Sequence, residues 1–100
     1  MKSRRSKACD ITQSVKKKVW ERDGGRCILC GSPYAMPNAH YISRAHSGLG
    51  IEQNVVTLCQ DCHFKYDNTT GRNVYREIIK GYLIGKYFDW DESKLTYKKF

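Results

Sequence analysis

Cys27-Ile28-Leu29-Cys30-Gly31 and Cys59-Gln60-Asp61-Cys62-His63 are the stretches that decide how this chain folds. In each, two residues separate a pair of cysteines, and this spacing lets both sulfurs face one metal ion. The 28 residues between the pairs leave room for a hairpin. Four thiolates form a closed tetrahedral zinc site that holds structure and does no hydrolysis. We therefore predict a structural Zn²⁺ bound by Cys27, Cys30, Cys59 and Cys62, the alternative being free thiols or redox pairs.

The chain has 100 residues, which fits a single domain over 1–100. A core of this size often needs a metal ion or disulfides to be stable. The first ten residues are polar and basic, and no stretch approaches the roughly 18 apolar residues of a membrane span. These features predict a cytoplasmic protein without a membrane partner, in which paired cysteines favour metal binding over disulfides.

The formal charge of +8 is unevenly distributed. Residues 1–26 hold nine Lys and Arg against three Asp and Glu, residues 27–71 hold two against three, and residues 72–100 hold seven against four. Basic flanks around a nearly neutral centre suit a polyanionic partner, most simply nucleic acid. The alternative is a soluble basic protein that binds nothing specific.

Apolar periodicity and turn residues predict a small α+β fold. Ser14 is the expected N-cap of an N-terminal helix over 15–23, and a C-terminal helix is expected over 73–84. The other expected parts are a flexible basic arm over 1–12, strands over 36–44 and 55–58, a helix from the second cysteine pair through Asp67, and a tail that folds back onto the core.

All three histidines of the chain lie between the first cysteine pair and Asp67. His40 falls on a predicted strand, and His63 falls at the start of a predicted helix. Phosphodiester hydrolysis needs a base that activates water and a divalent cation that offsets charge on the phosphate. One histidine as base and one as metal ligand would meet this need. Asn54 could hold a backbone turn or the base, or bind the metal through its amide oxygen.

His40, Asn54 and His63, in this order and enclosed by the two cysteine pairs, resemble the motif of the HNH endonucleases, in their zinc-bearing branch. The resemblance covers roughly residues 20–67 and implies a ββα-metal core, with 72–100 as a C-terminal helix and tail. It implies that His40 is the general base, that Asn54 orients the site, and that His63 binds a catalytic divalent cation (Mg²⁺, Mn²⁺, Ni²⁺ or Zn²⁺). The tail from Trp90 is similar to tails of small HNH proteins of phages and prophages.

The chain departs from the family pattern at Ala39, where many members carry an acidic or histidine metal ligand. Asn38 is a possible substitute, because alternation along a regular strand would point it in the same direction as His40. A shifted register would instead put Tyr41 in the position of the base. Arg44 follows on the same loop and is a candidate contact for the scissile phosphate.

The resemblance implies a metal-dependent DNA endonuclease that nicks or cuts duplex DNA in a bacterium or a phage-infected host. Two alternatives stay open. The first is a zinc-stapled nucleic-acid-binding module without catalysis, which Ala39 favours. The second is a nuclease subunit that works only with phage packaging or recombination proteins.

Overall fold

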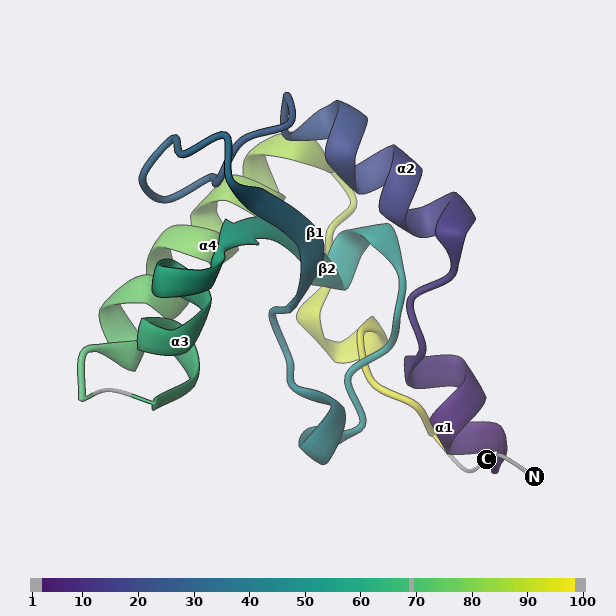
Figure 1. The fold of residues 1–100 in the computed structure, drawn as a ribbon. Helices are drawn as coiled ribbons and strands as arrows, with labels where there is room; N and C mark the ends of the chain where they lie inside the picture. Colours follow the sequence, from purple (N-terminus) through teal and green to yellow (C-terminus); the bar gives the residue numbers. More distant parts are fainter. Residues whose placement is uncertain (1–2, 69, 99–100) are drawn as a thin grey trace.

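A computed structural model describes residues 3–68 and 70–98 as a small α+β structure (Figure 1). Among these residues, two antiparallel strands form a ribbon that lies between α2 on one side and the pair α3 and α4 on the other. All five residues of the second strand are buried, as expected for a strand covered on both faces. The elements are α1 (Arg4–Cys9), α2 (Gln13–Arg22), β1 (Ala35–His40), β2 (Val55–Cys59), α3 (Gln60–Asn68) and α4 (Arg72–Lys86).

The two strands pair out of step by one residue. Met36 pairs with Leu58, and Ala39 pairs with Val56, so three steps along β1 match two steps along β2. The extra residue is a bulge at Pro37 and Asn38, where proline offers no amide hydrogen to the ladder. Because side chains alternate between faces, the bulge puts Met36 and His40 on opposite faces of the ribbon.

The predicted helices are present, with shifted ends. Helix α2 begins at Gln13, two residues before the expected start, because Thr12 is the N-cap in place of Ser14 and its Oγ1 accepts a hydrogen bond from the amide of Val15 at 3.2 Å. Helix α4 extends the predicted helix by one residue at its start and two at its end. Its Ile79 and Leu83 are fully buried and belong to the core.

The segment predicted to be a flexible arm over 1–12 contains a packed helix instead. Helix α1 is capped by Ser3, whose hydroxyl accepts from the amide of Ser6, and Cys9 at its end is only 1% exposed. A methyl group at Gly50 would lie 2.0 Å from the backbone oxygen of Asp10, so only glycine allows this close approach. Met1 and Lys2, at the start of the predicted arm, and Lys99 and Phe100, at the end of the predicted tail, lie outside the described residues.

The C-terminal tail folds back onto the core as predicted. Trp90 donates its indole N–H to the backbone oxygen of Gln53 at 2.8 Å and packs edge-on against the ring of Tyr41. Leu95 is only 2% exposed and joins the core. None of the helices formed by residues 3–68 and 70–98 has both the length and the apolar character that crossing a bilayer requires.

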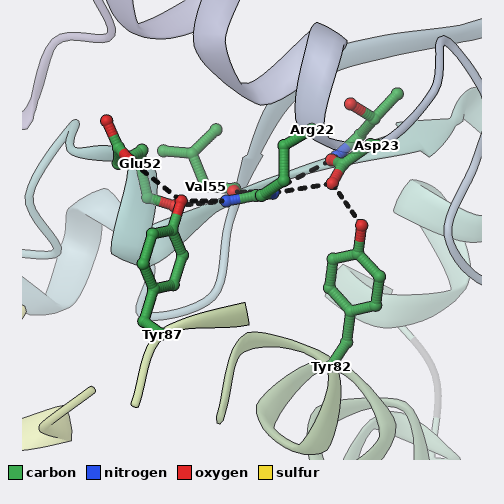
Figure 2. A network of polar contacts seen from close by, with 7 residues as sticks. Arg22, Asp23, Glu52, Val55, Tyr82 and Tyr87 are labelled. Carbon is green, nitrogen blue, oxygen red and sulfur yellow. Dashed lines mark hydrogen bonds and ion pairs between the residues drawn. The ribbon is translucent and has the colours of Figure 1, made fainter. Parts of the chain in front are cut away.

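A buried ion pair fastens α2 to β2 and α4 (Figure 2). Arg22 and Asp23 have side chains that are 11% and 0% exposed, and their Nε and Oδ1 atoms lie 2.7 Å apart. Asp23 also accepts hydrogen bonds from the Tyr82 hydroxyl at 2.6 Å and from the amide of Thr57 at 2.8 Å. Burial and the bond to Asp23 raise the pKa of Tyr82 to about 12, so its hydroxyl remains a donor at neutral pH.

Candidate functional site

The four cysteines converge on one point. The sulfurs of Cys27, Cys30, Cys59 and Cys62 all lie within 4.8 Å of one another. Cys30 and Cys59 are separated by 3.6 Å, close to the sulfur–sulfur distance that a tetrahedral site with metal–sulfur bonds of about 2.3 Å requires. Among the described residues, no other group of three or more His, Cys, Asp or Glu side chains comes together in this way. The cluster is compatible with a structural metal ion.

The backbone around the first cysteine pair is shaped for this cluster. Gly31, directly after Cys30, has a φ of +79°, a conformation that residues other than glycine rarely adopt. Burial of the Cys27 thiol acts to raise its pKa, but hydrogen bonds from the backbone of Cys59, Cys30 and Leu29 outweigh burial and lower the pKa to about 7. A thiol that ionises near neutral pH is suited to bind a metal ion.

His40 and His63 lie in one open hollow, which we call the central hollow. Its volume is about 390 Å³. His40 comes from the end of β1 and His63 from the first turn of α3, so the ribbon and the helix that meet at the cysteine cluster also bring the two histidines together. The lining residues are His40, Ser43, Arg44, Ala45, His63, Asp67 and Arg72.

The imidazole of His40 is held by the backbone of α1. Its Nε2 lies 2.9 Å from the carbonyl oxygen of Cys9. A carbonyl oxygen only accepts hydrogen bonds, so Nε2 carries the proton and Nδ1 has a free lone pair. Burial lowers the pKa of His40, with smaller contributions from the charges of Arg44 and His63, although the bond to Cys9 acts in the opposite direction. The ring is therefore neutral at pH 7.

Asp67 is a candidate site residue that the sequence reasoning did not assign. Its Oδ2 lies 3.2 Å from Nε2 of His63, one helical turn earlier in α3. Two ligands that bind one cation at right angles, each at about 2.1 Å, would be roughly 3 Å apart. The signal in the sequence was the i, i+4 spacing within a helix, which places both side chains on one face.

Asn54 pins the loop that follows His40. Its Oδ1 accepts from the amide of Ile42 at 2.8 Å, and its Nδ2 donates to the carbonyl oxygens of Ile42 at 3.1 Å and Leu49 at 2.8 Å. The side chain is fully buried. These contacts hold the backbone turn after His40, which is one of the roles considered for Asn54, and burial keeps the side chain out of the lining of the central hollow.

Two arginines line the central hollow. The side chain of Arg44 is 46% exposed and forms an ion pair with Asp10 at 2.9 Å. Arg5 donates a hydrogen bond to the backbone oxygen of Arg44. The guanidinium of Arg72 lies 5.3 Å from the ring centre of Tyr66, and its Nε is buried without a hydrogen-bond partner among the described residues. Sequence reasoning singled out Arg44 and missed Arg72, which precedes the predicted C-terminal helix.

Other predicted candidates lie elsewhere. Asn38 lines a neighbouring hollow, because the bulge removes the expected alternation with His40. Ala39 is fully buried in the core. Tyr41 is also fully buried, and its hydroxyl donates to Glu92 at 2.6 Å, which does not fit the alternative in which it acts as the base.

Comparisons of the chain with protein-family models, with curated proteins and with solved structures find no match.

Proposed function

We propose that this chain is a metal-dependent endonuclease that hydrolyses phosphodiester bonds of DNA, with a ββα-metal core of the HNH type. The observation that carries the proposal is the central hollow. It combines a neutral histidine, a histidine–carboxylate pair and two arginines within one open surface depression. A phosphodiester needs a base, a cation site and positive charge around its oxygens, and these residues supply each of them.

In this proposal, His40 takes the proton from the attacking water at Nδ1, because Nε2 is already engaged with the carbonyl of Cys9. Asn54 keeps the loop after β1 in place, and this loop carries Arg44. Arg44 and Arg72 bind the non-bridging phosphate oxygens through charge-assisted hydrogen bonds.

A divalent cation would be held by His63 and Asp67, with phosphate oxygens and water completing its shell. Magnesium commonly binds proteins through one or two carboxylates together with substrate phosphates, so a small donor set of this kind fits. Bound there, the cation would stabilise the charge on the phosphate and on the leaving oxygen. Because Asp67 supplies a carboxylate from α3, the cation site does not need an acidic residue in place of the buried Ala39.

Replacing His40 by alanine is expected to lower the cleavage rate by roughly 10²- to 10⁴-fold, the usual contribution of a general base. The measurement is conversion of supercoiled plasmid to nicked and linear forms, with Mg²⁺, Mn²⁺, Ni²⁺ and Zn²⁺ titrated separately. The cysteine cluster is left intact by this change, so metal content and the far-UV circular dichroism spectrum should match those of the wild type.

Phe88→Ala is the control, since this fully exposed side chain does not line the central hollow. Its activity should stay within a few-fold of the wild type. Equal cleavage by His40→Ala and the wild type would contradict the assigned base. A folded wild-type protein that binds DNA and cleaves with none of the metals would favour a binding module or a subunit that awaits its complex.

Asp67→Asn is expected to raise the metal concentration needed for half-maximal cleavage by roughly 10- to 100-fold, because loss of a ligand or of its hydrogen-bonded partner weakens metal binding by this order. Saturating metal should restore part of the rate. Asp61→Asn provides the comparison, since this exposed carboxylate of the same helix does not line the hollow. A metal dependence that is the same in both variants would remove Asp67 from the cation site.

A further inference from the structure

Two further hollows adjoin the central hollow, and each shares lining residues with it. The central hollow shares His63 with a second one of about 480 Å³, which we call the aromatic hollow. On its other side it shares Ser43 and Arg72 with a third, which we call the basic hollow. The basic hollow has a volume of about 410 Å³, and its lining includes Arg72, Arg76 and His46. Through these shared residues the three hollows follow one another in a row, with different chemistry at its two ends.

The aromatic hollow has apolar walls. Tyr34 is 87% exposed and Met36 is 60% exposed, and the lining also includes the buried Leu58 of β2, which pairs with Met36. The backbone of the loop at Tyr34 is restrained in two ways. The amide of Tyr34 donates a hydrogen bond to the hydroxyl of Ser32 at 3.1 Å, and Pro33 restricts the backbone just before it. An exposed aromatic ring on such a loop is available for stacking on another planar ring.

Two amide side chains give the aromatic hollow polar groups as well. Asn38 and Gln60 both line it and are exposed. An amide offers a donor and an acceptor together, the pattern that matches the edge of a nucleobase. Asn38 is in this position because of the β1 bulge, which separates it from His40. The hollow therefore pairs a stacking surface with groups that can hydrogen-bond to the edge of the same ring.

We infer that the aromatic hollow binds an unpaired nucleobase of the DNA whose phosphate lies in the central hollow, with the next stretch of backbone running over the basic hollow. This inference rests on the proposed function and adds a substrate class to it. In a regular duplex each base is stacked on its neighbours and exposes only its edges, so only an unstacked base can present a face to Tyr34. The preferred substrate is then DNA with an unpaired nucleotide at the cleavage position, in a single strand, a flap or a bulge.

The test compares binding of two fluorescent DNA duplexes, one fully paired and one with a single unpaired nucleotide, by anisotropy without added divalent cation. The wild type should bind the second duplex about tenfold more tightly, since one base–aromatic stack corresponds to roughly this factor. Tyr34→Ala should lose this preference, and Tyr34→Phe should keep it. Phe88→Ala is the matched control, because this fully exposed aromatic ring lines none of the three hollows and its loss should leave the preference unchanged.

Equal affinity of the wild type for the two duplexes, or a preference that survives Tyr34→Ala, would overturn the inference. Plasmid cleavage is measured on the same preparations, so the two proposals can fail separately. Cleavage without any preference for the unpaired nucleotide would leave the endonuclease standing and remove the aromatic hollow from substrate binding. A preference that depends on Tyr34 in a protein that never cleaves would support the base site and overturn the catalytic assignment.

Discussion

Replacing Cys59 by serine is expected to unfold the protein at room temperature and to abolish its metal content. Binding of a structural zinc ion contributes roughly 10–16 kcal/mol to the folding free energy of small zinc-binding domains. The free energy of unfolding of an ordinary domain is only about 5–15 kcal/mol. Cys59 is the last residue of β2 and directly precedes α3, and its sulfur lies within reach of the three other cysteine sulfurs. A two-stranded ribbon is only marginally stable by itself, so the metal-bound cluster should supply most of what holds the first cysteine loop to β2 and α3.

The measurement combines metal analysis by mass spectrometry with thermal and urea unfolding followed by circular dichroism. The wild type should contain one tightly bound ion per chain, and a strong chelator should unfold it as Cys59→Ser does. Cys9→Ser is the matched control, because this cysteine is equally buried but lies outside the cluster. It should keep the ion and lose little stability. A folded Cys59→Ser protein with a full complement of metal would contradict the structural role of the cluster.

Replacing Asp23 by alanine is expected to lower the free energy of unfolding by about 3–5 kcal/mol, the range seen when one partner of a buried ion pair is removed. The change leaves the guanidinium of Arg22 buried without its counter-charge and removes the acceptor of the Tyr82 hydroxyl. It also leaves the amide of Thr57 without its acceptor in the middle of β2.

The structural effect of Asp23→Ala should extend toward the central hollow. Arg22 donates to the backbone oxygens of Glu52 and Val55, both at 2.7 Å, and these residues flank Asn54, which pins the loop after His40 (Figure 2). Asp23→Ala should therefore reduce cleavage even under conditions in which the protein is still mostly folded.

Urea unfolding measures the stability change. Lys18→Ala is the control, because Lys18 is 63% exposed and its 3.7 Å contact with Glu52 is a surface pair of the kind that contributes about 0–1 kcal/mol. If Asp23→Ala and Lys18→Ala shifted the unfolding midpoint equally, the buried pair would not be the fastening point between α2, β2 and α4.

Local patterns in the sequence were sufficient for much of the fold. The cysteine spacing predicted the cluster, because two residues between cysteines dictate a tight turn wherever it occurs. The β-branched run at Val55 predicted β2, and the apolar period within 73–84 predicted α4. His40 was predicted on a strand and His63 at the start of a helix, and both line the central hollow.

The helices of the core and each Cys-x-x-Cys turn were readable from the sequence because they depend on residues close together in the chain, and the two turns could be joined because four thiolates suit one metal ion. Only the tertiary structure decided what surrounds them. The carbonyl oxygen of Cys9 contacts His40 across 31 positions, a contact that no local pattern encodes, and the segment predicted as a flexible arm contains the helix that ends at Cys9. The β1 bulge arises from register with β2 rather than from β1 alone, and it moved Asn38 into a different hollow from His40. Asp67 and Arg72 join the central hollow because α3 and the start of α4 pack beside the ribbon, and packing of this kind is set by the whole core at once.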